Sequence, residues 1–260
     1  MVDLLALYDA ELRTEPEVLG ASTVRRIGPL WAATFGDDHL FVTYQGLDDP
    51  GARVADVAGL LAAEPAIATA EWKARSHDDA PGLENALSAA GFVAGEAESV
   101  MLGEAAALSE APVPVGVTVR RLTAPAEMRA ALDVQDAVFG GKQYAERLLA
   151  EILADQAAGG GIELWAAEVD GQFVSAGRIT PIPGTAFAGI WGGATLPEYR
   201  GRGIYRALTA ARVRSAMARG VRWIHSDSTE DSRPILERSG LVKVTETVPW
   251  EWERPARELR

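Results

Sequence analysis

The stretch that decides how this chain folds is PEYRGRGIYRAL, residues 197–208, because it places two glycines and three arginines where a helix begins. The start of a helix leaves backbone N–H groups without partners and carries the positive end of the helix dipole, so it attracts anions. Gly201 and Gly203 carry no Cβ and let the backbone approach a ligand closely. The stretch therefore predicts an anion-binding loop.

The charge around this loop differs from that of the rest of the chain. Seven arginines and no acid lie between Tyr199 and Asp227, whereas the 260-residue chain has a formal net charge of −12. The arginines nearest the loop are suited to a phosphate: Arg200, Arg202 and Arg206. Others are expected on the solvated face of a helix over 203–219: Arg212, Arg214 and Arg219.

The composition limits the classes of function. With a pI near 4.8, the surface repels nucleic acid and anionic membranes. No uncharged run approaches the roughly 18 residues that span a bilayer, and the first residues are acidic where a signal peptide is basic. We therefore expect a cytoplasmic protein. Since the chain has no cysteine, it has no disulfide, no thiolate metal site and no cysteine acyl-enzyme, and we expect no metal.

A segment without sustained periodicity, residues 103–116, predicts a linker between two patterned regions. In the second region the patterns predict one order of elements: a strand (118–123), two helices (126–140, 142–156), a three-stranded meander (163–195), a helix (203–219), a strand (221–227), a short helix (232–239) and a last strand (241–253).

The two regions resemble each other. Residues 82–102 superpose on 231–251, with Gly91 on Gly240 and Leu87 on Leu236, and each segment follows a strand that contains tryptophan. We infer two related halves, 1–110 and 111–260. The alternative, that any helix-glycine-strand unit gives such a match, stays open.

Two common phosphate motifs do not fit the glycine loop. A dinucleotide fingerprint needs a third glycine where Arg206 stands, and a P-loop needs Gly-Lys-Ser/Thr, whereas the Gly-Lys pair at 141–142 continues into Gln143. What remains resembles motif A of the GCN5-related N-acetyltransferase (GNAT) superfamily, Arg/Gln-x-x-Gly-x-Gly/Ala. Arg200 and Gly203 fit it, but Tyr205 replaces the small last residue. Whether this tyrosine narrows the approach of a pyrophosphate or offers it a hydroxyl stays open.

The resemblance covers roughly residues 116–252, and the predicted order of elements is that of the family. It implies an α/β (α+β) GNAT fold, with a central mixed, mostly antiparallel, twisted sheet flanked by helices. It also implies acetyl-CoA as co-substrate. The positions that would contact it are Ala194, Thr195, Leu196, Arg200, Gly201, Arg202, Gly203, Ile204, Tyr205 and Thr229.

Paired glycines in a strand, Gly192 and Gly193, suggest a bulge or close backbone approach. The family has a bulge there, which separates this strand from the next and lets the pantetheine arm pair with it; simple packing of small residues is the alternative. The resemblance further implies that a backbone N–H near Gly193 or Ala194 polarises the thioester carbonyl.

Two catalytic groups of the family need replacements here. The usual thiol-protonating tyrosine aligns with Leu236, which cannot donate a proton. For the base, alternation along strand 221–227 places His225 and Asp227 on one face at its carboxyl end. The alternatives are a packing role for His225 and a turn cap for Asp227, while Glu198 is expected in solvent.

The first half lacks the glycine loop, since Asp48 and Asp49 stand where a pyrophosphate would bind. We expect it to be a degenerate GNAT-like domain that walls the acceptor cleft. Polar residues of its loop at 77–79 are either cleft groups or a helix-capping loop.

The leading hypothesis is an N-acetyltransferase that transfers an acetyl group from acetyl-CoA to an amine by direct attack in a ternary complex. A non-catalytic acyl-CoA sensor or scaffold and an anion-binding structural protein are the alternatives. The expected partner is a small-molecule or peptide amine, with neither nucleic acid nor membrane. The acyl-chain length and a homodimer are left open.

Overall fold

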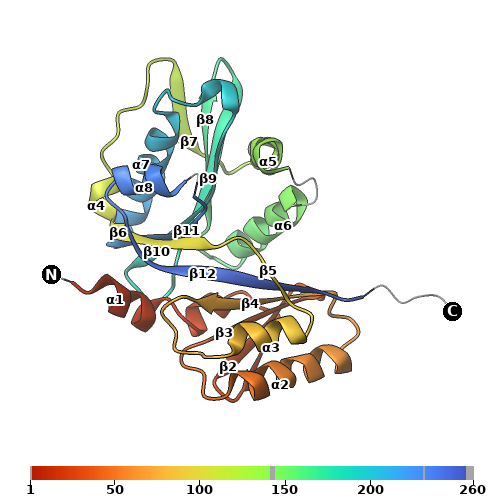
Figure 1. Ribbon diagram of the computed structural model, residues 1–260. Coiled ribbons are helices and arrows are strands. Elements are labelled where there is room, and N and C mark those ends of the chain that lie inside the picture. The colour runs from red at the N-terminus through yellow and green to blue at the C-terminus, as the bar shows by residue number, and fades with distance from the viewer. Residues whose placement is uncertain (1, 141–143, 231, 256–260) are drawn as a thin grey trace. The chain divides into compact units, whose positions relative to one another are not determined.

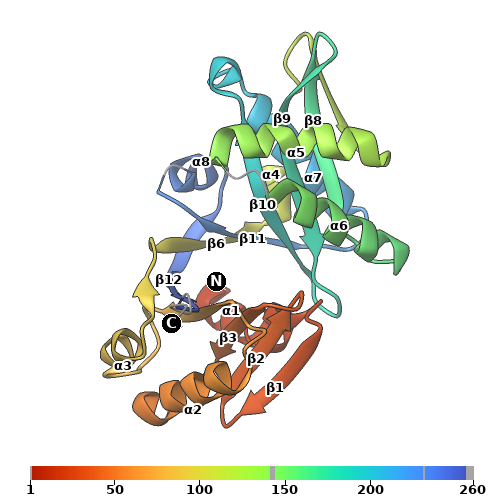
Figure 2. The ribbon, with the colours of Figure 1, turned by 90° about the vertical axis from the view of Figure 1, so that its right-hand side faces the viewer.

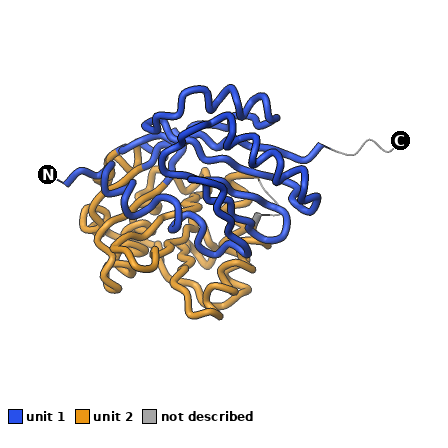
Figure 3. Tube along the Cα trace, turned by 90° about the horizontal axis from the view of Figure 1, so that it is seen from below, with its two compact units in different colours: residues 1–100, 227–233, 243–260 blue, residues 101–226, 234–242 orange. Residues whose placement is uncertain are grey.

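The computed structural model describes residues 2–140, 144–230 and 232–255. The backbone divides into two compact units (Figure 3). Unit 1 comprises Met1–Val100, Asp227–Arg233 and Lys243–Arg260, and unit 2 comprises Met101–Ser226 and Pro234–Val242.

Unit 1 is built on a sheet with the strand order β1-β2-β3-β4-β12, with β5 beside β12. Strands β3 and β4 are parallel, and the other pairs are antiparallel. Its elements are α1 (Leu4–Glu11), η1 (Glu15–Val18), β1 (Thr23–Ile27), β2 (Leu30–Phe35), β3 (His39–Tyr44), α2 (Pro50–Ala63), β4 (Thr69–Arg75), α3 (Leu83–Ala89), β5 (Val93–Ala94) and β12 (Val242–Glu253) (Figure 1).

Alternation along the strands gives this sheet one apolar face. Trp72 of β4 lies opposite Trp250 of β12, and both pack in one core with Val42, Leu61 of α2 and Leu87 of α3. The intervening residues of β4 point to the other face, as the two-residue period of a strand requires. That face is polar, and α1 and η1 contact it.

Unit 2 is built on the order β6-β11-β10-β9-β8-β7, in which β10 and β11 are parallel and the pairs from β10 to β7 are antiparallel. Its elements are β6 (Glu98–Glu104), α4 (Ala105–Leu108), β7 (Val117–Arg121), α5 (Pro125–Phe139), α6 (Tyr144–Ala157), β8 (Glu163–Val169), β9 (Gln172–Pro181), β10 (Phe187–Thr195), η2 (Pro197–Tyr199), α7 (Ile204–Met217), β11 (Trp223–Ser228) and α8 (Arg233–Arg238).

Helices cover both faces of the unit 2 sheet. Ala166 packs in the core formed with α5 and α6, whereas its neighbour Ala167 packs in a cluster with Ile204 of α7. Because consecutive strand residues point to opposite faces, α7 lies across the sheet from α5 and α6 (Figure 2). The predicted fold class, a mixed and mostly antiparallel sheet flanked by helices, is confirmed.

The predicted order of elements after residue 117 is also confirmed, although Lys142 and Gln143 lie outside the described residues. The linker prediction was wrong for its first part. Strand β6 runs to Glu104 and α4 occupies Ala105–Leu108. Alanine-rich residues 105–108 form too short a helix to show a period in the sequence. Among the residues described, none of the helices is both long and apolar enough to cross a membrane.

The last strand of each sequence half belongs to the other unit. Strand β6 follows α3 of unit 1, yet its residues from Met101 onward belong to unit 2; β12 follows α8, yet Lys243 onward belongs to unit 1. The two helix-glycine-strand segments also match in detail. Gly91 and Gly240 have φ of +87° and +100°, and the aligned Leu87 and Leu236 are both buried. The division into halves 1–110 and 111–260 stays a prediction.

Leu87→Ala is expected to lower the free energy of unfolding by about 2–5 kcal/mol, because it empties a fully buried position of the unit 1 core. Urea unfolding followed by tryptophan fluorescence measures the change. Val93→Ala is the control, since Val93 is 69% exposed. A loss below about 1 kcal/mol for Leu87→Ala would contradict this packing.

Candidate functional site

Strands β10 and β11 pair only at their start. Their register runs from Phe187 opposite Trp223 to Gly189 opposite His225, while β10 continues to Thr195 along β9. The register with β9 shifts between Trp191 and Ala194. The predicted bulge at Gly192 and Gly193 is therefore confirmed, and it lies beyond Gly189, the last residue of β10 that pairs with β11.

A buried glutamine holds the bulge. Gln135 of α5 is 1% exposed, and its Nε2 donates to the carbonyl of Gly192 at 2.7 Å. Gly192 has φ +59°, and a Cβ there would lie 2.8 Å from the same Nε2. The sequence interpretation missed Gln135. Its signal was a polar residue on the apolar face of α5, three and four positions from the buried Leu132 and Ala131.

The glycine loop has the geometry that an anion site needs. After η2, Gly201 and Gly203 have φ of +73° and +78°, which other residues rarely adopt. Gly203 is the N-cap of α7, and no side chain caps the first amides of that helix. Arg200 Nε donates to the carbonyl of Thr195 at 3.0 Å, and the exposed Arg202 lies over the Tyr199 ring at 5.1 Å. The loop is braced internally by these contacts, and its N-cap glycine offers no side chain to the first amides of α7.

The end of β10 is held by β9. Ser175 Oγ donates to the carbonyl of Ala194 at 2.7 Å and lies 2.8 Å from Thr195 Oγ1. The N–H of Leu196 donates to the carbonyl of Val174 at 2.9 Å. That N–H is therefore used within the unit.

The prediction that Arg212 lies in solvent was wrong. Arg212 is 0% exposed, and its guanidinium donates to the carbonyl of Arg178 at 2.9 Å and to Thr209 Oγ1 at 3.0 Å. The side chain of Tyr205 is near enough to interact electrostatically with it. Burial lowers the pKa of Arg212, and Tyr205 partly offsets that effect. Nine of the 14 residues of α7 are buried, so its exposed face is narrower than a helix of mixed arginines and alanines suggests. Arg214 and Arg219 are exposed, as predicted.

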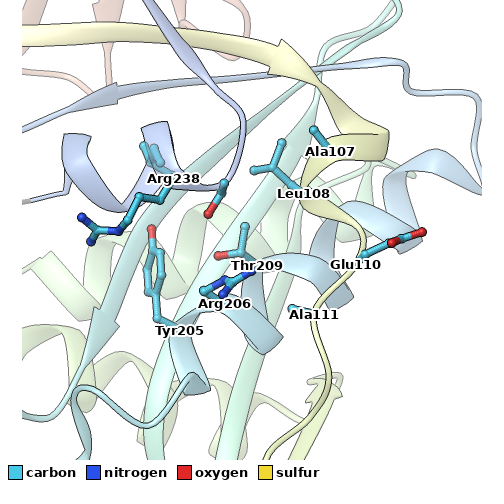
Figure 4. A pocket seen from close by; sticks show the side chains of 10 residues that line it. Ala107, Leu108, Glu110, Ala111, Tyr205, Arg206, Thr209 and Arg238 are labelled. Atoms are coloured by element: carbon cyan, nitrogen blue, oxygen red, sulfur yellow. The ribbon is translucent and has the colours of Figure 1, made fainter.

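Tyr205 lies against the bulge. A Cβ on Gly193 would be 2.6 Å from Tyr205 Cε2 and 2.9 Å from its Oη. Tyr205 also lines a cavity of about 60 Å³ (Figure 4). The remaining lining residues are Ala107, Leu108, Glu110, Ala111, Arg206, Thr209, Leu236, Arg238 and Ser239.

His225 stands at the last paired position of β11. It is 8% exposed and contacts the rings of Trp191 and Phe187 edge-on, with centroid distances of 5.1 and 6.5 Å. The predicted placement of His225 beside a cleft stays a prediction. Its aromatic contacts also match the packing alternative.

Asp227 and Thr229 belong to unit 1. Asp227 Oδ2 accepts a hydrogen bond from Lys73 Nζ at 2.6 Å. Thr229 is exposed; its hydroxyl lies 3.3 Å from Ser232 Oγ, and its carbonyl accepts the N–H of Arg233. The roles predicted for both residues stay predictions.

Buried charges line the polar face of unit 1. Glu17 forms ion pairs with Arg75, which is completely buried, and with Lys73 at 3.5 Å. Burial raises the pKa of Glu17, but Arg75 and Lys73 outweigh it and hold that pKa below its usual value. Burial likewise lowers the pKa of Lys73, and the carboxylates of Asp227 and Glu17 raise it above its usual value. The network is a structural ion cluster with mutual partners.

The loop of the first half that corresponds to the glycine loop is closed by its own acid. Asp49 caps α2 by accepting the N–H of Ala52 at 3.0 Å. In the 77–79 loop, His77 lies 3.1 Å from Asp9 Oδ1, and Asp78 pairs with the buried Arg13 at 2.9 Å. These groups are occupied within unit 1.

Residues 105–226 match the family model described as acetyltransferase (GNAT) domain. The chain contains a GNAT acetyltransferase domain. The matched GNAT residues include the bulge, the glycine loop and His225, whereas Asp227 and Thr229 follow the end of the match. No curated protein matches the chain.

Solved structures share the GNAT fold along most of the chain. A functionally unknown conserved protein from Staphylococcus epidermidis has a TM-score of 0.73 at 17% identity, covering 93% of this chain and 98% of its own. A GCN5-related N-acetyltransferase from Kribbella flavida has 0.69 at 17%, covering 99% and 98%. A tandem GNAT protein from the clavulanic acid biosynthesis pathway has 0.63 at 17%, covering 89% and 82%.

Glu17→Gln is expected to destabilise the protein by about 3–5 kcal/mol at pH 7, because it leaves buried Arg75 without its carboxylate. A depressed carboxyl pKa stabilises the fold above the unfolded value, near 4.5, and that contribution is lost as the pH falls through the folded value. Urea unfolding across pH 3–8 should therefore show a shallower acid limb in the variant.

Glu98→Gln is the matched control. Burial, and then the Asp227 carboxylate, raise the pKa of Glu98, so the charged form is disfavoured in the folded state. This substitution should not lower stability at pH 7. Equal losses for the two variants would contradict the assignment of Glu17 as the stabilising acid.

Proposed function

We propose that this GNAT domain is an N-acetyltransferase that uses acetyl-CoA and transfers the acetyl group to an amine by direct attack in a ternary complex. The observation that carries the proposal is the start of α7 at Gly203, which has no side-chain cap, in the same unit as the part of β10 beyond Gly189, where its strand pairing with β11 has ended. The first feature suits a pyrophosphate and the second suits an extended arm that adds to a sheet edge.

The loop residues fit this donor chemically. The amides of Arg202, Gly203, Ile204 and Tyr205 would bind the pyrophosphate, with the exposed guanidinium of Arg202 adding charge. Arg200 instead braces the loop through its hydrogen bond to Thr195. In the first half, Asp49 already occupies the corresponding helix start. We therefore propose that only the second half binds acetyl-CoA and that the first half is degenerate.

Acetyl-CoA supplies an activated thioester, and the chain has to polarise its carbonyl and accept a proton from the attacking amine. The bulge leaves backbone N–H groups near Gly193 and Ala194 to polarise the carbonyl. His225, at the point where β10 and β11 part, is proposed as the base, directly or through water. Asp227 is already held by Lys73. The proposed acceptor is a small-molecule or peptide amine.

A sensor or scaffold that binds acyl-CoA without turnover is the second candidate. One observation favours it: Leu236, at the position of the usual acid, is 2% exposed and packs in an apolar cluster with Ile190 and Val213. Release of free thiol separates the candidates. Since the chain has no cysteine, a thiol reagent detects the released CoA without background from the protein.

Gly203→Glu is expected to weaken acetyl-CoA binding at least about 10-fold, or about 1.4 kcal/mol, because it places a carboxylate at the helix start. Isothermal titration calorimetry measures the dissociation constant. Gly184→Glu is the matched control: Gly184 has the same φ of +78° and an open environment, so it shares the backbone strain of the substitution.

Absence of acetyl-CoA binding by the folded wild-type protein would overturn the proposal. Binding without thiol release in the presence of spermidine, glucosamine or a lysine-containing peptide would favour the sensor. Equal weakening by both glutamates would show that the loop is not the binding site.

A further inference from the structure

The inference below rests on the proposed acetyl transfer and concerns its last proton. The sulfur that leaves a thioester needs a proton or a stabilising charge. Leu236 offers neither, and it is buried in an apolar cluster. A proton donor for the departing sulfur therefore has to be a side chain other than that of Leu236.

The hydroxyl of Tyr205 lies beside Gly193, in the bulge of β10. The tyrosine rises from the first turn of α7, and its ring covers the backbone of Gly193 inside the bulge. The hydroxyl is therefore beside the backbone proposed to polarise the carbonyl. Tyr205 and Leu236 line the same cavity, and the Tyr205 hydroxyl points toward Arg238 across it (Figure 4). A phenol from α7 thus reaches the cavity that Leu236 lines, which the polar side chains of Arg206, Thr209, Arg238 and Ser239 also line.

Arg212 gives this phenol an unusual environment. It lies seven residues, or two turns, after Tyr205 on α7, so both side chains share one helix face. It is completely buried, and among residues 2–140, 144–230 and 232–255 no carboxylate forms an ion pair with it. Buried charges are normally paired. This guanidinium instead contacts carbonyls, Thr209 and the Tyr205 side chain.

The backbone reserves space for both side chains. A Cβ on Gly193 would collide with the Tyr205 ring, and one on Gly177 of β9 would collide with the Arg212 guanidinium. The side chains of Tyr205 and Arg212 therefore require glycine at positions 193 and 177.

We propose that Tyr205 is the general acid of the transfer and protonates the departing sulfur. Arg212 is proposed to position the Tyr205 phenol and to stabilise the negative charge of its phenolate. The amine nitrogen forms a bond to the acetyl carbon, the carbon–sulfur bond breaks, and the phenol proton moves to sulfur. The phenolate oxygen keeps the electron pair of its O–H bond, opposite the N–H groups of Arg212. The proton that the amine loses returns to Tyr205 through the base and water, so no net charge accumulates.

Tyr205→Phe tests the acid directly, because it keeps the ring over Gly193 and removes only the hydroxyl. The kcat for CoA release should fall at least about 100-fold, with the dissociation constant of acetyl-CoA changed less than about 2-fold. Tyr199→Phe is the matched control, since it removes a hydroxyl from the adjoining loop and keeps the ring that contacts Arg202.

Calorimetry provides a second readout that needs no acceptor. At pH 9, the wild-type protein should bind CoA at least about 5-fold more tightly than desulfo-CoA, because the phenol donates to the thiolate. Tyr205→Phe should bind both equally. Arg212→Lys keeps the charge but not the planar donors, so it should fold and retain acetyl-CoA binding, while the kcat for CoA release falls.

The outcomes distinguish the two proposals. Failure of the wild-type protein to bind acetyl-CoA overturns the proposed function and this inference together. Normal binding with kcat and sulfur discrimination unchanged in Tyr205→Phe overturns only the acid. Tighter binding with kcat retained would instead identify the Tyr205 hydroxyl as a steric obstruction and would also overturn the acid.

Discussion

Strand β10 pairs with β11 only over its first three residues, and its pairing with β9 is interrupted by a bulge at Gly192–Gly193. The geometry of the site depends on this irregularity. Gln135 holds it from the α5 side and Tyr205 covers it from α7. Helices on both faces therefore fix the position at which the edge of β10 opens. A larger residue at either glycine would displace one of these two side chains.

Local patterns were enough to predict the helices, the meander and the glycine loop, because periodicity, turn residues and positive φ are properties of short segments. The site was predicted less completely. Arg212 was assigned to solvent because the exposed side of a helix depends on what packs around it, and α7 is buried over most of its surface. The seven-residue spacing between Tyr205 and Arg212 can be seen in the sequence. That both side chains point toward the sheet could be recognised only from the folded structure. Gln135 escaped notice for the same reason.

The polar face of unit 1 shows a second limit of sequence reasoning. Glu17 meets Arg75, and Lys73 meets Asp227 across 154 positions, so no local motif could pair them. Asp227 had been interpreted from its strand alone, next to His225. The structure provides it with a buried ammonium partner. A carboxylate that is neutralised by such an ion pair has a structural role in unit 1 in addition to any other role.

The reciprocal placement of β6 and β12 has a consequence for biosynthesis. Strand β4 pairs with β12, which begins only at Val242, so the sheet of unit 1 keeps an unpaired edge during synthesis until β12 has been translated. An exposed edge invites association with other chains. Glu71 and Lys73 are charged residues of β4. Their charges disfavour association with other chains until β12 has been synthesised. Completion of the unit 1 sheet therefore has to wait for synthesis of a strand that comes after all of unit 2 except its last residue, Val242.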